Sequence, residues 1–327
     1  MGKFLQTEKP KQVAFKQTSS SISAAAKGDG MYKEHVYPFC LPRSLAEENL
    51  YPPIRQTICA YFERNRIKWH DGQDGKPSNH MCDSQVCCAN FLFPFADKPE
   101  ALASLLKPIF PNLEEMLPIE DDLYVAFEWI GKDNYLHEVS RNAQRTRGAN
   151  FTSADAAVRF RRTDGCEQIS LIEWKYTESY SSVNLEVAAS RRSRVDIYRW
   201  LFEQPDCPID KAKLPCFEAL FYEPFYQFMR QQFLAYEMEK AHELGADVVS
   251  LLHIAPAHNL DFKTITSPLL KAQGTSATGV WKSLITLPDR FISVSTETLF
   301  GNLDAERFPE LKEWQAYIHG RYTWMAC

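Results

Sequence analysis

Two strand-like runs separated by a short turn constrain the fold of this 327-residue chain most strongly. The first run is "AAVRFRR" (156–162) and the second is "QISLIEWKY" (168–176), and both are rich in residues that favour strands. The "TDG" between them is a favourable hairpin turn. We therefore predict an antiparallel hairpin. Helical patterns precede and follow it, which indicates an α/β domain with a mixed central sheet.

The second run changes from apolar to charged along one of its faces. Residues i and i+2 of a strand point to the same side of a sheet. The face that changes carries Ile169, Leu171, Glu173 and Lys175. The opposite face carries Ile172, Trp174 and Tyr176. This pattern is typical of a strand whose middle is in the core and whose end presents a site.

Three polar side chains are expected to meet at the open end of this hairpin. The turn brings Asp155 beside Glu173 and Lys175. Two carboxylates that close repel each other unless a cation lies between them, and Mg²⁺ takes a few carboxylates and several waters. Such an ion polarises a phosphodiester and activates a bound water, while Lys175 orients that water or offsets transition-state charge. The alternative is a surface ion pair of Glu173 with Lys175, with Asp155 as a turn residue.

An Asp, a hairpin and Glu-x-Lys on its second strand together resemble the PD-(D/E)xK nuclease superfamily, which has the restriction-endonuclease-like fold. The resemblance implies that Asp155 and Glu173 bind Mg²⁺ or Mn²⁺ and that Lys175 is catalytic. One part of the motif is missing, because Ala154 stands where the family has a proline. The resemblance covers residues 123–255 and leaves out the N-terminal third.

A second element of the same superfamily lies downstream, in "QFLAY". Gln232 and Tyr236 are one helical turn apart and resemble the Gln-x-x-x-Tyr element of the RecB and λ-exonuclease group, which implies that they support the catalytic site. Several families of the superfamily also use a glutamate upstream of the first Asp. Glu138 is therefore a further candidate catalytic acid, with a surface helix acid as the alternative. Glu128, flanked by apolar residues, is its rival for that position.

An arginine-rich loop precedes the first carboxylate. It contains Arg141, Arg145 and Arg147, and Gly148 and Asn150 mark it as a loop. Guanidinium groups beside a metal site suit contacts with a phosphate backbone. Arg145, Arg147 and Asn150 are therefore candidate substrate-binding residues.

Three further arginines lie on the next predicted helix. Arg191, Arg192 and Arg194 could extend the basic patch of the loop. The alternative is a solvated helix face on which they pair with Glu186 and Asp196.

Periodic patterns predict the remaining elements and three regions. Residues 1–33 are expected to form a flexible leader, residues 34–120 a helical region packed on the core, and residues 121–327 the nuclease-like α/β core. Helices are expected over 53–69, on both sides of Pro94, over 187–204, over 218–245 with a break near Pro224, and over 309–322. Further strands are expected over 123–131, 246–256 and 290–296.

Composition narrows the range of functions. The net charge is −5, so nucleic acid must bind a local basic patch. Nine cysteines without a secretory signal indicate free thiols in a reducing compartment, and no apolar run is long enough to predict a membrane span. We expect a cytoplasmic Mg²⁺-dependent nuclease that binds nucleic acid, DNA in preference to RNA, and no membrane. The alternative is a non-catalytic nucleic-acid- or protein-binding module on the same fold.

Overall fold

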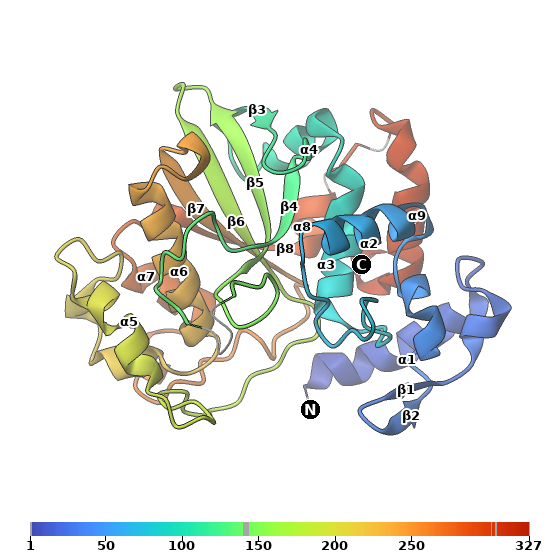
Figure 1. Cartoon of the computed structure of the whole chain (residues 1–327), viewed down its shortest axis with the longest axis horizontal. Coiled ribbons are helices and arrows are strands. Elements are labelled where there is room, and N and C mark those ends of the chain that lie inside the picture. The colour runs from blue at the N-terminus through green and yellow to red at the C-terminus, as the bar shows by residue number, and fades with distance from the viewer. Residues whose placement is uncertain (1, 140–143, 302, 305, 327) are drawn as a thin grey trace.

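A six-stranded mixed sheet between two layers of helices forms the centre of the molecule (Figure 1). The computed structural model describes residues 2–139, 144–301, 303–304 and 306–326. The predicted α/β fold with a mixed central sheet is thus confirmed. Among the described residues, no helix combines the length and the apolar character needed to cross a bilayer.

The strands of the sheet are antiparallel on one side and parallel on the other. They are β3 (Leu113–Leu117), β4 (Val125–Trp129), β5 (Ala154–Arg162), β6 (Glu167–Trp174), β7 (Val248–Ala255) and β8 (Phe291–Ser295). The order is β3-β5-β6-β7-β8, and β4 pairs with β5 next to β3. The predicted hairpin is β5 and β6, which are antiparallel, whereas β6, β7 and β8 are parallel. A separate antiparallel pair is formed by β1 (Gly30–Tyr32) and β2 (His35–Tyr37).

Helices cover both faces of the sheet (Figure 1). One face carries α5 (Arg194–Glu203), α6 (Phe225–Lys240) and α7 (Ala277–Leu284). The other carries α2 (Arg55–Arg64), α3 (Ser84–Leu92), α4 (Pro99–Leu106), α8 (Thr296–Gly301) and α9 (Lys312–Arg321). Helix α6 begins directly after Pro224, at the predicted break. Helix α5 begins at Arg194 rather than at residue 187, because the Ser193 hydroxyl caps it by accepting a hydrogen bond from the N–H of Asp196 (3.2 Å).

The alternation predicted for β6 holds in the packing. Ile169 and Leu171 belong to the apolar cluster on the α6 side of the sheet. Ile172, Trp174 and Tyr176 belong to the cluster on the α3 side. Both layers therefore depend on β6, and the charged residues at its end follow the face that packs on α6.

The segment expected as a flexible leader forms a helix instead. Helix α1 (Lys3–Thr18) buries Glu8, Gln12 and Lys16 one turn apart. Gln12 donates hydrogen bonds to the Tyr176 hydroxyl (3.2 Å) and to the carbonyl of Arg321 (3.1 Å). A helix with a buried polar face shows no apolar periodicity, and its partners lie far along the chain. A local composition signal therefore could not predict it.

The central sheet also takes a strand from the region expected to be helical. Strand β3 lies within residues 34–120 and pairs with the far half of β5. Two successive exposed residues of β3, Glu114 and Glu115, interrupt the alternation of buried and exposed residues that predicts a strand. The pairing with β5 also shifts in register between Leu113 and Glu115. The expected boundary at residue 120 therefore does not coincide with the start of the sheet.

Candidate active site

The register of the sheet brings three carboxylates to the same level at one end. Strands β5 and β6 pair Ala156 with Ile172, which places Asp155 directly opposite Glu173. Strand β4 pairs with the other side of β5, and Glu128 stands at the level of Asp155. The structure thus brings Asp155 and Glu173 together, as expected from the hairpin, and adds Glu128 on the third strand.

Asp155 is held by the backbone of β6 and is surrounded by negative charge. Its Oδ2 accepts a hydrogen bond from the N–H of Trp174 (2.7 Å). Burial, followed by the charge of Glu173, raises the pKa of Asp155 well above its usual value. Like charges directly opposite each other destabilise a sheet. This edge therefore concentrates negative charge that a cation would offset.

Lys175 supplies one positive charge to the same point. Its ammonium forms an ion pair with Oε1 of Glu173, and both side chains are buried. Burial alone would lower the pKa of Lys175, but the neighbouring charges, chiefly that of Glu173, outweigh it and raise the pKa well above its usual value. These charges favour the protonated form of Lys175, in which it donates hydrogen bonds.

Glu128 adopts a backbone conformation that is rare for its residue type. Its φ is +48° within β4, a left-handed value that costs energy outside glycine and that accumulates at functional sites. Arg147 stabilises it by donating to the Glu128 carbonyl (3.1 Å). The neighbouring loop residue Gly148 also has a left-handed backbone, with φ +72°. It packs against the backbone of Lys68, and a Cβ at Gly148 would lie 2.6 Å from the Lys68 carbonyl oxygen. Burial first, and to a smaller extent the charge of Glu173, raises the pKa of Glu128.

Two glutamines, one from each helical layer, hold two of the carboxylates. Gln85 of α3 donates to Oε1 of Glu128 (2.7 Å), and its own carbonyl accepts from the N–H of His70 (2.7 Å). Gln231 of α6 donates to Oε2 of Glu173 and to the carbonyl of Ser153 (3.4 Å).

Ser153 connects these two glutamines into one chain of hydrogen bonds. Its hydroxyl donates to Oε2 of Glu128 (2.8 Å), while its carbonyl accepts from Gln231. The side chains at the end of the sheet thus belong to one network that links α3, β4, β6 and α6.

The donor set fits a hard divalent ion that keeps most of its waters. Oε1 of Glu173 is buried and, within the described part of the chain, receives no directed hydrogen bond besides its ion contact with Lys175. Among the same residues no group of three or more histidine, cysteine, aspartate or glutamate side chains is placed to hold a metal ion. Mg²⁺ is commonly bound by one or two carboxylates with waters and substrate phosphate. Asp155 and Glu173 are the residues that would hold it.

A cavity of about 640 Å³ opens at this end of the sheet beside Asp155, whereas Glu173 is buried and does not line it. Glu128, Asp155 and Lys175 line it from the sheet, and His70, Ser84 and Gln85 line it from the N-terminal region. Its volume is in the range of ligand sites. A cavity of similar volume between α2 and α9 (about 610 Å³) has none of these carboxylates in its lining. The N-terminal region is therefore part of the wall of the candidate site.

The predicted Gln-x-x-x-Tyr pair lies elsewhere. Gln232 and Tyr236 line a separate, small cavity of about 100 Å³ together with Asp206 and Arg290. The residue that reaches Glu173 is Gln231, one position earlier. The structure therefore does not support the assignment of Gln232 and Tyr236 to the site. The motif match depended on spacing alone, which does not determine which face of α6 meets the sheet.

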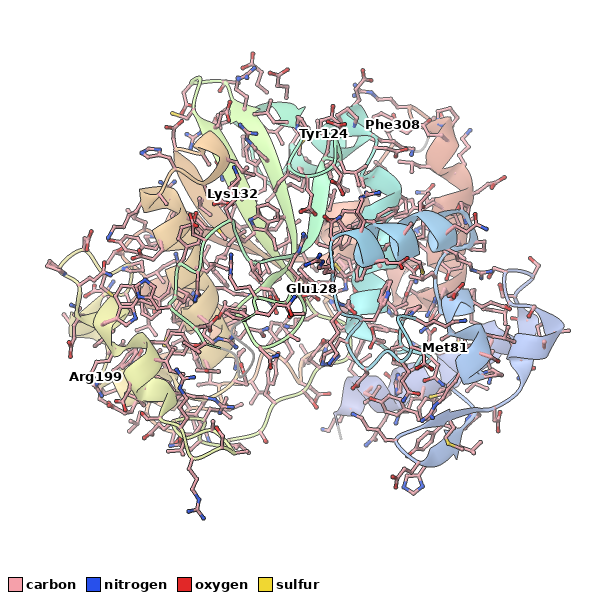
Figure 2. The ribbon with its side chains drawn as sticks, in the orientation of Figure 1. Met81, Tyr124, Glu128, Lys132, Arg199 and Phe308 are labelled. Carbon is pink, nitrogen blue, oxygen red and sulfur yellow. The ribbon has the colours of Figure 1, made fainter. Side chains whose placement is uncertain are left out.

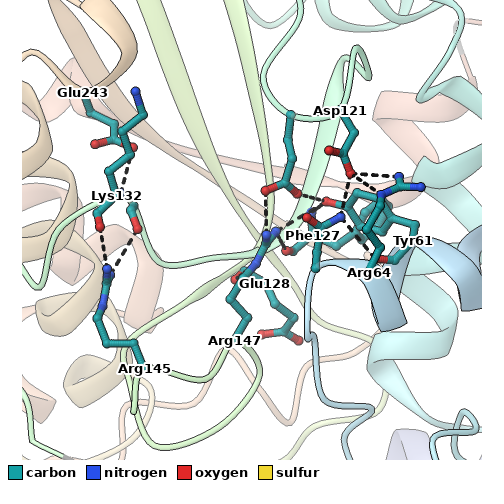
Figure 3. Close-up of polar contacts among 12 residues, drawn as sticks. Tyr61, Arg64, Asp121, Phe127, Glu128, Lys132, Arg145, Arg147 and Glu243 are labelled. Carbon is teal, nitrogen blue, oxygen red and sulfur yellow. Dashed lines mark hydrogen bonds and ion pairs between the residues drawn. The ribbon is translucent and has the colours of Figure 1, made fainter. Parts of the chain in front are cut away.

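The predicted substrate-binding arginines form hydrogen bonds and an ion pair within the protein itself (Figure 3). Arg145 donates to the carbonyls of Ile130 (2.7 Å), Gly131 (3.1 Å) and Lys132 (2.7 Å). Arg147 pairs with Glu120 (2.7 Å) and also bonds the Tyr61 hydroxyl and the Phe127 and Glu128 carbonyls. Both therefore brace the end of β4 rather than face a ligand. Asn150 does line the cavity, and Arg141 lies outside the described residues.

Glu138 lines the cavity, but its carboxylate is fully engaged. It accepts hydrogen bonds from the N–H and hydroxyl of Thr152 (2.6 and 2.7 Å) and from the Tyr198 hydroxyl (2.6 Å), and it lies 3.4 Å from Arg230. These contacts anchor the loop before β5 to α5 and α6. Both oxygens of Glu128 are engaged as well, by Gln85 and Ser153, but Glu128 stands at the level of Asp155 on β4; which of the two is the additional acid stays a prediction. The sequence signal for Glu128 was a charge within an apolar strand, the same signal that identified Glu173.

The mixed central sheet flanked by helices is consistent with the restriction-endonuclease-like fold. Residues 9–323 match the family described as "Restriction Endonuclease associating with ARP", and the chain belongs to this family. Comparison with curated proteins and with solved structures finds no match.

Proposed function

We propose that this protein is a metal-dependent nuclease that hydrolyses phosphodiester bonds in nucleic acid, DNA in preference to RNA. The observation that carries the proposal is the direct opposition of Asp155 and Glu173 across β5 and β6, with Lys175 paired to the same carboxylate. Membership of a restriction-endonuclease family supports it. A second part of the proposal is that the association with ARP in the family description extends to this chain.

Each residue of the site has a distinct task in this proposal. Asp155 and Glu173 would hold Mg²⁺ or Mn²⁺, and such an ion would supply Lewis-acid activation of the phosphodiester and of a water. Lys175 would donate in its protonated form to the attacking water or to the phosphate oxygens as negative charge develops. Gln231 fixes the rotamer of Glu173 by its hydrogen bond. Glu128 would add negative charge at the level of Asp155, and Gln85 and Ser153 orient its carboxylate.

One observation favours a second candidate function. The ion pair of Lys175 with Glu173 offsets part of the negative charge without a metal. A non-catalytic nucleic-acid- or protein-binding module could therefore keep the same fold and side chains. The two candidates differ in whether a divalent ion is needed.

Cleavage assays separate these candidates. The wild-type protein is incubated with single- and double-stranded DNA and RNA, with Mg²⁺, with Mn²⁺ or with a chelator. We expect metal-dependent cleavage that falls by about a hundredfold or more in Glu173→Gln, which removes a charge at the reacting centre. Glu167→Gln is the matched control, because Glu167 is at the opposite end of the same strand and pairs with Arg159. Cleavage that is absent in every condition, or undiminished in Glu173→Gln, contradicts the proposal.

A further inference from the structure

The cavity over the carboxylates has a second, cationic wall. Arg192 and Arg194 line it at the start of α5, and Arg230 lines it from α6. Tyr226 stands between two of them, since the guanidinium carbon of Arg194 lies 5.6 Å from the centre of its ring and that of Arg230 lies 5.3 Å from it. The stacked ring keeps these two side chains in place. The cavity thus has acids at the end of the sheet and arginines on its side.

The three arginines differ in how much of their charge is already offset. Arg230 is 3.4 Å from Glu138 and donates to the Thr152 hydroxyl (2.9 Å). Arg192 and Arg194 have no acidic side chain within ion-pair distance in the part of the chain that the structure describes. Their hydrogen bonds are to carbonyls, of Val139 (3.4 Å) and Leu185 (3.1 Å) respectively.

These contacts leave two guanidinium groups available to a ligand. The expected pairing with Glu186 and Asp196 does not occur among the described residues, where neither acid forms an ion pair with Arg192 or Arg194, although Arg192 is exposed to solvent. A guanidinium carries five N–H donors, and within the described part of the chain each of these two gives one hydrogen bond to the protein. Arg194 is half-buried at the cavity wall, while Arg192 is exposed at its rim. Two guanidinium groups without an acidic partner among the described residues can bind an anion that enters the cavity.

We propose that Arg192, Arg194 and Arg230 form a phosphate subsite, which binds the backbone phosphate of the substrate strand next to the one that is cleaved. This inference rests on the proposed nuclease function. Planar guanidinium groups bind phosphate oxygens in a bidentate manner. Arg230 is held in place by Glu138 and completes the cationic side of the cavity. Arg192 and Arg194 supply the charge that no acidic side chain of the described residues offsets. The protein has a net charge of −5, so this wall is the local patch through which it approaches a polyanion.

Binding is measured apart from cleavage, with short fluorescently labelled DNA and RNA strands in the presence of a chelator. We expect Arg192→Ala and Arg194→Ala each to weaken the affinity by about tenfold, the loss of one charge-assisted contact. The slope of log Kd against log salt concentration should fall by about one for each arginine removed. Arg194→Lys should keep the salt slope but weaken the affinity, because lysine keeps the positive charge and lacks the planar guanidinium that binds phosphate through two hydrogen bonds. The Arg194→Lys variant also shows whether an effect of Arg194→Ala comes from the lost charge or from disturbed folding.

Arg199→Ala is the matched control. Arg199 is on the same helix, pairs with Glu218 (3.0 Å) and does not line the cavity, and Figure 2 shows it well away from Glu128. It should leave both the affinity and the salt slope unchanged. If the variant with both Arg192→Ala and Arg194→Ala binds as Arg199→Ala does, the subsite is wrong. If those arginines matter for binding while no metal-dependent cleavage is found, the subsite stands and the hydrolytic function fails.

Discussion

Gln231 of α6 donates a hydrogen bond to the carboxylate of Glu173 on β6, whereas its neighbour Gln232 faces a different cavity. Successive residues of a helix point about 100° apart, so a shift of one position moves a side chain from the site to another surface. Gln231 also donates to the carbonyl of Ser153. The amide therefore fixes Glu173 relative to the neighbouring strand.

The pair of adjacent glutamines provides a direct comparison. We expect Gln231→Ala to lower kcat by about tenfold or more, because Glu173 loses the donor that orients it and small misplacements of catalytic groups are costly. Gln232→Ala should leave kcat within about twofold of the wild type. Steady-state cleavage rates of the two variants check this. A larger loss in Gln232→Ala would restore the Gln-x-x-x-Tyr assignment.

Asp155→Asn should raise the melting temperature of the metal-free protein at neutral pH. The raised pKa of Asp155 means that the folded protein holds this proton more tightly than the unfolded chain. The stabilisation by the proton is complete below the usual aspartate pKa and is lost as the pH rises through the folded-state value. The asparagine variant avoids that loss, so its advantage should be greatest at neutral pH and vanish in acid.

Asp164→Asn is the control for this pH dependence. Asp164 is an exposed turn residue whose pKa is lowered, first by a hydrogen bond from the N–H of Cys166. The ionised form of Asp164 therefore stabilises the folded protein, the opposite of Asp155, and Asp164→Asn should gain no stability at neutral pH. Thermal melts over a range of pH test both variants. Equal behaviour of the two would contradict the repulsion described at Asp155.

The pair of Lys175 and Glu173 should behave as one unit in stability. Lys175→Met leaves a buried carboxylate without its cation, and we expect a loss of about 3–5 kcal/mol. Glu173→Gln leaves a buried ammonium and should cost a similar amount. The double variant should regain most of that free energy of unfolding while staying inactive. Denaturant unfolding of the three variants measures this, and purely additive losses would show that the pair is not coupled.

Arg147→Ala should reduce stability rather than substrate affinity. Its guanidinium pairs with Glu120, both side chains are mostly buried, and it holds the backbone at Glu128. We expect a loss of about 3–5 kcal/mol, since its removal takes away the cation paired with the Glu120 carboxylate and leaves that carboxylate with the Tyr61 hydroxyl as a donor. The salt slope of nucleic-acid binding should not change. A reduced slope with unchanged stability would show instead that Arg147 contacts phosphate.

The parts of the fold that were predictable depend on short-range patterns. The alternation along 169–176 and the "TDG" turn are local, and they place Asp155, Glu173 and Lys175 correctly. Helix α1 was not predictable, because its buried Gln12 bonds residues as distant as Tyr176 and Arg321.

Side-chain partners were the least predictable part of the site. Arg145 and Arg147 have the composition of a phosphate-binding loop, yet their partners are backbone carbonyls and Glu120, which only the closed fold brings near. The catalytic roles of the site residues stay predictions.

The most direct test of the account is whether Asp155 and Glu173 bind a divalent ion together. Mn²⁺ is titrated by calorimetry into the wild type, Asp155→Asn, Glu173→Gln and the Glu167→Gln control. We predict that Mn²⁺ binds the wild type and Glu167→Gln alike, and that its affinity falls by at least about tenfold in each of the other two variants. Equal Mn²⁺ affinity in all four proteins, or no binding to any, would show that Lys175 alone neutralises these carboxylates.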